Sequence, residues 1–161
     1  MANIYEQAIH KFGEKRQLLL TVEAYAELSK QLIKTVNQRL DIHALSRAVA
    51  EAIVGTEYIK VVVPNIQRSS ETWEVNEKNY EFLTKTILRY TVYVNEWVFA
   101  SDDDDNGTRR NQKYIHLHIA EIIEILKQLR AYLGEDLIDT LIATKLSHLK
   151  KSMNNDRTVY Y

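Results

Sequence analysis

Residues that interrupt regular structure are scarce in this chain, which has one proline, Pro64, and four glycines among 161 residues. A β-rich protein needs glycine, proline and similar turn residues between its many short strands. A helical protein needs fewer turns, because one helix commonly runs for about 8 to 20 residues. The sequence therefore predicts an all-α fold, and its 45% apolar content is enough for one domain with a hydrophobic core.

Apolar residues recur at steps of three and four along most of the chain, which is the spacing that gives a helix one buried face. Pro64 opens a polar stretch, residues 64–79, which predicts a connection between residues 1–63 and residues 80–161. We expect residues 1–161 to form a single domain, a bundle of two similar helical hairpins with a last helix packed across them. The expected helices cover residues 4–12, 14–40, 42–63, 77–100, about 115–133, and 135–153.

Composition and charge argue against several classes of function. The chain has no cysteine, which removes disulfides, thiolate zinc sites and cysteine nucleophiles. Its formal net charge is -1 and no basic tract is concentrated, so duplex nucleic acid is not an expected partner. The opening MANIYEQAIHKFGEKR lacks the apolar core of a signal peptide, and no apolar run approaches the roughly 20 residues that span a bilayer. We therefore expect a cytoplasmic protein without membrane contact.

Two carboxylates, Glu23 and Glu27, lie one helical turn apart in LLLTVEAYAELSKQLIK, residues 18–34. At about 100° per residue they share a polar stripe with Lys30 and Lys34, and we expect solvated pairs among these side chains. Gln31 and Asn37 extend the same stripe. The expected apolar side of this helix consists of Leu18, Val22, Tyr25, Leu28, Leu32, Ile33 and Val36.

The stretch SDDDDNGTRR, residues 101–110, matches the first half of a calcium-binding loop at Asp102, Asp104, Asn106 and Gly107. Such a loop is closed by a bidentate acid at its twelfth position, which here is Lys113. Adjacent aspartates also repel one another, so we interpret the stretch as a solvated connection.

Residues 8–34, AIHKFGEKRQLLLTVEAYAELSKQLIK, resemble the start of the MazG-like all-α nucleoside triphosphate pyrophosphohydrolases. Members of this family commonly carry an aromatic residue followed by glycine, a glutamine four residues on, and a Glu-Glu-x-x-Glu-Leu helix. The second half-motif of the family, Glu-x-x-Asp, aligns with EAIVGTE, residues 51–57. The residues at the positions of the first motif are Phe12, Gly13, Gln17, Glu23, Glu27 and Leu28.

The resemblance also implies where a metal site would lie. In the family, four acids on two antiparallel helices hold Mg²⁺, and only one of the four positions keeps its acid here. Glu23 and Glu51 are immediate neighbours of these positions, turned about 100° from the ligand direction. We therefore expect no Mg²⁺ or other metal, and no catalytic residue. The four positions are Ala24, Glu27, Ala52 and Gly55.

Residues 118–151 resemble the second helix and tail of the same family, which predicts that residues 80–161 are a diverged second repeat. In one register His118 and Glu121 stand at the ligand positions. An alternative register reproduces the family spacing with four acids but leaves almost no room for a turn between them. These four acids are Glu121, Glu124, Asp136 and Asp139.

Two functions are compatible with these patterns. The loss of three ligands favours a catalytically degenerate protein of the kind carried by phages and mobile elements, which would bind another protein and could still bind a nucleotide. The alternative is a Mg²⁺-dependent enzyme that releases a nucleoside monophosphate and pyrophosphate. Ten tyrosines and two tryptophans exceed what one small core needs, so we also expect a homodimer.

Overall fold

The computed structural model describes residues 3–67, 75–76, 78–100 and 105–155. In these ranges the prediction of an all-α fold is confirmed, because six helices and no strand are present. The helices are α1 (Ile4–Phe12), α2 (Glu14–Val36), α3 (Ile42–Val62), α4 (Tyr80–Ala100), α5 (Asp105–Leu133) and α6 (Glu135–Asn154).

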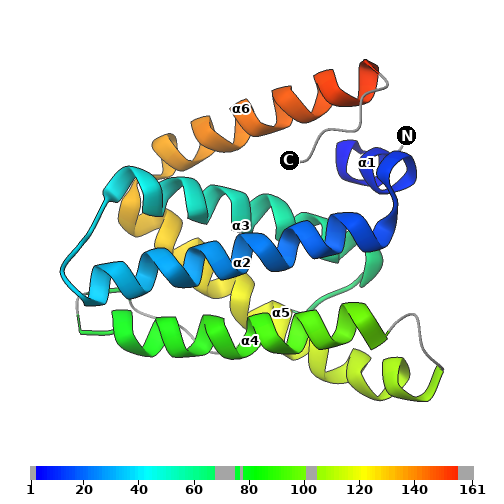
Figure 1. Ribbon diagram of the computed structural model, residues 1–161, viewed down its shortest axis with the longest axis horizontal. Helices are drawn as coiled ribbons and strands as arrows, with labels where there is room; N and C mark the ends of the chain where they lie inside the picture. Colours follow the sequence, from blue (N-terminus) through cyan, green and yellow to red (C-terminus); the bar gives the residue numbers. More distant parts are fainter. Residues whose placement is uncertain (1–2, 68–74, 77, 101–104, 156–161) are drawn as a thin grey trace.

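Four helices form a ring around the main core (Figure 1). α2 packs against α3 and α4, and α5 completes the ring by packing against the same two helices. α2 and α3 run antiparallel, as do α4 and α5, so the chain contains two helical hairpins. α6 packs against α3 and α5, one helix from each hairpin, and α1 lies against α2, α3 and α6. That the second hairpin is a diverged copy of the first stays a prediction.

Two clusters of buried side chains hold these helices together. The main core lies inside the ring and takes its seams from the apolar residues spaced three and four apart. A smaller core joins α1, α3 and α6 through Ala8, Val54, Tyr58 and Leu149. The largest fully buried side chains of the main core are Tyr25, Leu28, Leu32, Leu45, Ile59, Leu83, Ile87, Ile115, Ile119, Ile122 and Ile125.

The turn between α2 and α3 shows how local chemistry ends one helix and starts the next. The Gln38 and Arg39 amides donate to the carbonyls of Thr35 and Lys34, with Gln38 at a φ of 60°, which is the Schellman pattern of a helix end. α2 therefore ends at Val36. The end expected from the sequence was residue 40. No glycine marks this helix end. Asp41 then caps α3, as predicted.

The expected solvated connection after α4 is partly helical. α5 begins at Asp105, well before the expected start near residue 115, so residues 105–110 of SDDDDNGTRR belong to a helix. Asp102 and Asp104 lie outside the described residues.

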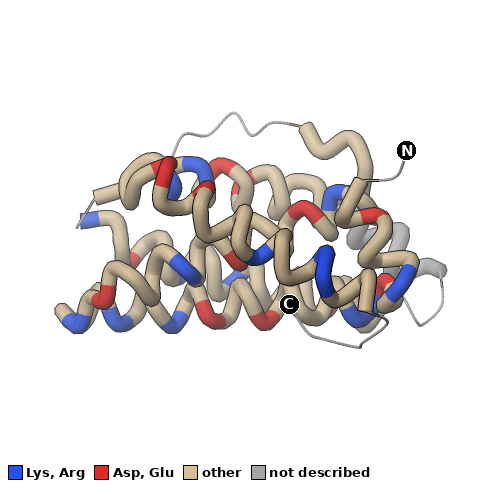
Figure 2. Tube along the Cα trace, turned by 90° about the horizontal axis from the view of Figure 1, so that it is seen from above, with Lys and Arg blue, Asp and Glu red and all other residues tan. Residues whose placement is uncertain are grey.

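Charged residues of both signs alternate along the molecule, and Figure 2 shows no described helix carrying one sign alone. Among the described helices, none is both long enough and apolar enough to cross a bilayer.

Candidate functional site

A pocket of about 370 Å³ opens between α2 and α3, beside α6. It gathers five of the six positions that the family resemblance assigns to the degenerate metal site, namely Glu23, Ala24, Glu27, Glu51 and Gly55. The remaining lining residues are Leu20, Thr21, Val54, Tyr58 and Lys145. Residues separated by about thirty positions in the sequence are therefore neighbours, because α2 and α3 are antiparallel.

Glu23 and Glu51 lie differently from the expectation. Both were expected to be turned away from the ligand direction, and both line the pocket together with Glu27. Ala52, an expected ligand position, is fully buried in the main core and does not line the pocket. From α3 the pocket is faced by Glu51 and Gly55, which are four residues apart and so share one helical face. The true pocket face of α3 is therefore shifted from the one the resemblance implies.

α2 and α3 approach each other closely at Gly55. The Thr21 hydroxyl donates a hydrogen bond of 2.9 Å to the Gly55 carbonyl oxygen. A Cβ atom at position 55 would lie 2.9 Å from Thr21 Cγ2 and 3.1 Å from Thr21 Cα, well inside the roughly 3.5–4.0 Å at which carbon atoms pack. Gly55 is therefore a packing residue, and an acid there would push the two helices apart.

A lysine from α6 brings positive charge to the acids of the pocket. The Lys145 ammonium nitrogen lies 3.8 Å from Glu51 Oε1, and the Lys145 side chain is only 19% exposed. The Glu51 side chain is 45% exposed, so the pair is only partly shielded from water. Sequence reasoning missed Lys145, since nothing in the local pattern of α6 indicates that it faces α3.

The exposed side of α2 differs from the expected polar stripe. Gln31 is buried, and its side-chain amide donates a hydrogen bond of 2.9 Å to Glu27 Oε1. Among the described side chains, Glu27 has this partner in place of the expected Lys30 or Lys34. Ile33 and Val36, expected on the buried side, are each 39% exposed. α2 packs against both α3 and α4, so two of its sides are buried and the boundary of the stripe is shifted.

The residues of the pocket do not fit a Mg²⁺ site of the family type. Mg²⁺ demands near-octahedral oxygen ligands at about 2.0–2.1 Å. Ala24 and Gly55 offer no side-chain oxygen at two of the implied positions, and an ammonium group stands beside Glu51. Within the described ranges, no three acidic or histidine side chains are arranged so that they could hold a metal ion.

Buried phenols lie at the pocket lined by Glu23, Glu27 and Glu51, called the acidic pocket from here on. Tyr58 lines it, and its hydroxyl is buried without a hydrogen bond of regular geometry. Burial raises the pKa of Tyr58, an effect that the Gln17 side chain partly offsets. The Tyr5 ring meets Tyr58 edge-on at 5.5 Å, and burial raises the pKa of Tyr5 to about 12. These phenols are therefore uncharged at neutral pH and add no negative charge to the pocket.

A second hollow of about 300 Å³ between α3 and α6 shares Glu51 and Lys145 with the acidic pocket. It adds the basic side chains Arg47 and His148. Glu51 and Lys145 therefore line both hollows, of which the first is otherwise acidic and the second otherwise basic.

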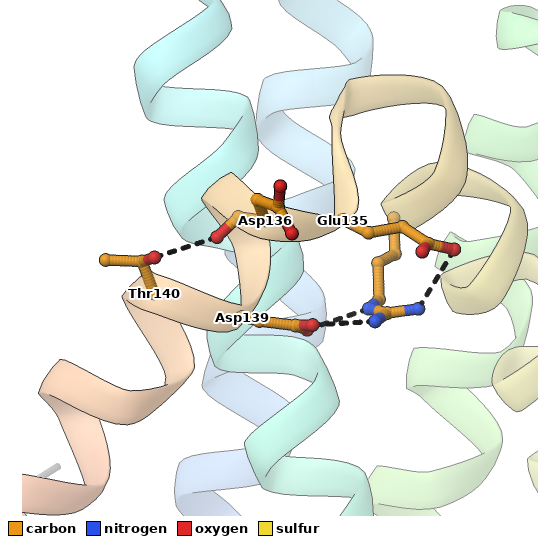
Figure 3. Close-up of polar contacts among 5 residues, drawn as sticks. Glu135, Asp136, Asp139 and Thr140 are labelled. Carbon is orange, nitrogen blue, oxygen red and sulfur yellow. Dashed lines mark hydrogen bonds and ion pairs between the residues drawn. The ribbon is translucent and has the colours of Figure 1, made fainter.

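The four acids of the alternative register have separate environments. Glu124 is buried and Asp136 is exposed. Arg130 donates two hydrogen bonds to Asp139, of 2.8 and 2.7 Å, and lies 3.2 Å from Glu135 Oε1. Figure 3 shows the Asp139 carboxylate facing the guanidinium group while Asp136 contributes its backbone carbonyl to Thr140. Asp139 thus fastens α6 to α5 across the single residue Gly134.

His118, the other candidate ligand of the second repeat, is engaged with aromatic rings. Its ring stacks on Tyr93 at 4.7 Å and lies 4.8 Å from Tyr90. Burial lowers the pKa of His118, and the charge of Arg89 acts in the same direction. An uncharged imidazole packed between two rings is a structural contact of the α4 and α5 hairpin.

Comparisons with protein-family models, with curated proteins and with solved structures find no match to this chain.

Proposed function

We propose that this chain is a catalytically degenerate protein on a MazG-like helical scaffold, and that it acts by binding another protein. The observation that supports the proposal is Lys145, whose ammonium group lies 3.8 Å from Glu51 in the acidic pocket. The protein itself thereby supplies positive charge where the acids of an active relative would attract a metal ion. A host enzyme, bound and blocked by a phage-type or mobile-element protein, is the kind of partner that the family association suggests.

The packing at Gly55 also supports a lost site. An acid at this position would meet Thr21 on the facing helix, so the close approach of α2 and α3 and a full set of acids exclude each other. Gly55 then stabilises the packing of the two helices at a position where an active relative would need a carboxylate to hold its metal ion.

An enzyme is the second candidate, and a specific observation favours it. Glu23, Glu27 and Glu51 line one pocket, so more carboxylates face it than the resemblance implies. The adjoining basic hollow with Arg47 would suit an anionic group such as a phosphate. A nucleoside triphosphate pyrophosphohydrolase is therefore the alternative that an experiment has to separate from the binding protein.

Incubation with the common ribonucleoside and deoxyribonucleoside triphosphates, in Mg²⁺ or Mn²⁺, separates the two. We expect no release of pyrophosphate above the rate without protein. Release that Glu27→Ala abolishes would replace the proposal with the enzyme.

Lys145→Gln tests directly whether Lys145 neutralises the negative charge of the pocket. Lys150→Gln is the matched control, because Lys150 is an exposed lysine on the same helix. Removal of the Lys145 charge should strengthen Mn²⁺ binding, measured by calorimetry, while Lys150→Gln leaves it unchanged. Equal binding in both variants would show that Lys145 does not balance these acids.

A further inference from the structure

The outer side of α4 has no other described helix packed on it. Among the described helices, α4 packs only against α2 and α5, whereas α1 and α6 lie across the ring from it (Figure 1). This side nevertheless carries five large apolar side chains that are 40–53% exposed. Single exposed apolar residues are ordinary on a protein surface, but a row along one helix is typical of a contact surface. The five are Phe82, Leu88, Val92, Tyr93 and Phe99. Two of them also touch the flanking helices, because Tyr93 stacks on His118 of α5 and the Lys15 ammonium of α2 lies 5.2 Å from the centre of the Phe99 ring.

The residues on this side complement a second copy of themselves. Two identical helices that pair antiparallel about a two-fold axis bring together residues equally distant from that axis. With the axis near Tyr90 and Thr91, Leu88 of one copy meets Val92 of the other. Leu88 and Val92 are four residues apart and so lie on one side of the helix, as this geometry requires.

The charges agree with the same axis. Lys85 meets Glu96 of the second copy, since both stand at nearly equal distances from the axis and are eleven residues apart, which is about three helical turns. Arg89 meets Tyr93 by the same rule, and a guanidinium group on a tyrosine ring is attractive. In one chain Lys85 has a solvent-exposed pair with Glu81 at 3.4 Å, which water and salt weaken.

We propose that the outer side of α4 is the interface of a homodimer in which the two α4 helices pair antiparallel about an axis near Tyr90. A second copy is the partner that fits, because the pattern of positive, apolar and negative side chains is its own complement when reversed. The proposal rests on the surface of α4 and is independent of the proposed function. One helix side is small beside the roughly 800 Å² per partner of a standard interface, so the dissociation constant should be on the order of 10 µM.

Charge reversal tests the pairing, read out by sedimentation velocity over a range of protein concentrations. Lys85→Glu sets a carboxylate at position 85 against Glu96, and Glu96→Lys sets two ammonium groups against each other, so each variant should dimerise about tenfold more weakly. An equimolar mixture of these two variants should regain the affinity of the unaltered chain, because every facing pair is then of opposite charge. The double variant should regain it as well.

Lys150→Glu, on α6, is the matched control and should not change the dissociation constant. Val92→Asp should give a monomer, and an unchanged circular dichroism spectrum will show that the helices are intact. The proposal is overturned if the unaltered chain is a monomer at about 100 µM, roughly tenfold above the expected dissociation constant, or if it is a dimer whose affinity neither charge reversal changes.

Discussion

Several buried serine and threonine hydroxyls of this bundle are satisfied by the helix that carries them, although the buried Ser46 hydroxyl has no hydrogen-bond partner among the described residues. Ser29 donates to the carbonyl of Tyr25, Thr56 to that of Ala52, and the buried Thr84 and Thr91 make the same contact on α4. Each bond spans four residues, so it forms as soon as the helix forms. A buried serine or threonine therefore needs no partner from another helix, and such residues can sit on packed sides of α2, α3 and α4.

The difference between Ala24 and Ala52 gives the first prediction. Ala24 lines the acidic pocket, so a glutamate there can reach water, whereas Ala52 is fully buried in the main core. We expect Ala24→Glu to lower the free energy of unfolding by less than about 1 kcal/mol, and Ala52→Glu to lower it by more than about 3 kcal/mol. Urea unfolding measures both. Equal losses would mean that position 52 faces the pocket after all.

Tyr25 gives a prediction about pH. Its hydroxyl lies 2.5 Å from the Thr56 hydroxyl, and Tyr25→Phe should cost about 0.5–1.5 kcal/mol at pH 7. Burial raises the pKa of Tyr25 above its ordinary value of 10.0. The neutral phenol is thus favoured in the folded state, and its contribution is complete below pH 10 and lost as the pH rises further. Tyr25→Phe should therefore flatten the alkaline loss of stability.

The exposed Tyr132 provides the control for this measurement. Tyr132→Phe should leave the alkaline limb of the stability curve as it is in the unaltered chain. If the two variants have the same alkaline limb, the titration of Tyr25 does not limit stability at high pH.

At the scale of single elements, helix ends decide how the chain changes direction. Asp41 accepts hydrogen bonds from the His43 and Ala44 amides at the start of α3. The Ala44 bond contributes most to the lowered pKa of Asp41. Gly134 joins α5 to α6 with a φ of 119°, a conformation that residues with a side chain rarely adopt. The angle between α5 and α6 is then held by Arg130.

The pairing of Arg130 with Asp139 gives a prediction for this corner. The hydrogen bonds from Arg130 lower the pKa of Asp139 below its ordinary value of 3.8. The pair therefore stabilises the fold above that pH, and this contribution is lost as the pH falls through the lowered pKa. Asp139→Asn should reduce the melting temperature at pH 7 by a few degrees. The difference from the unaltered chain should disappear in strong acid.

Asp136→Asn, in the same turn of α6, is the matched variant, because the Asp136 side chain is exposed and the described bonds of Arg130 go to its neighbours. Its melting temperature should stay closer to that of the unaltered chain at every pH. A larger effect at Asp136 than at Asp139 would contradict the role assigned to Arg130.

At the scale of the molecule, the two cores are unequal. α2, α3, α4 and α5 enclose most of the main core, which also contains Ile138 from the start of α6. α1 and the part of α6 around Leu149 are attached through the smaller core. Local opening takes place where few apolar contacts must be broken. We expect α1 and the part of α6 around Leu149 to open together, while the ring and the start of α6 stay folded.

Leu149→Ala tests this organisation, because Leu149 is buried in the smaller core. The lost contacts should cost about 2–4 kcal/mol. Amide hydrogen exchange in α1 and around Leu149 in α6 should then be at least roughly 30-fold faster, with α2 to α5 nearly unchanged. Leu129→Ala, in the main core, is the comparison and should accelerate exchange throughout the ring. Uniform acceleration by Leu149→Ala would show that the six helices open as one unit.

The sequence by itself determined the helices, because their causes are local. Apolar spacing, the cap at Asp41 and the glycines at 13 and 134 place five of the six helix starts within about three residues. The resemblance also pointed to the region of Glu23, Glu27 and Glu51, although it turned Glu23 and Glu51 away from the ligand direction. The apolar pattern of a helix does not reveal which other helix packs against it, since the same face can pack against any apolar partner.

Only the tertiary structure decided which atoms meet in the pocket. It placed Ala52 in the core and Glu51 in the same pocket as Glu23, because α3 packs against α2, α5 and α6 on different sides. It brought Lys145 to Glu51 across nearly a hundred residues, and it pressed Thr21 against Gly55. Each of these depends on how helices rotate about their own axes when several surfaces pack at once, and that rotation is a property of the whole bundle.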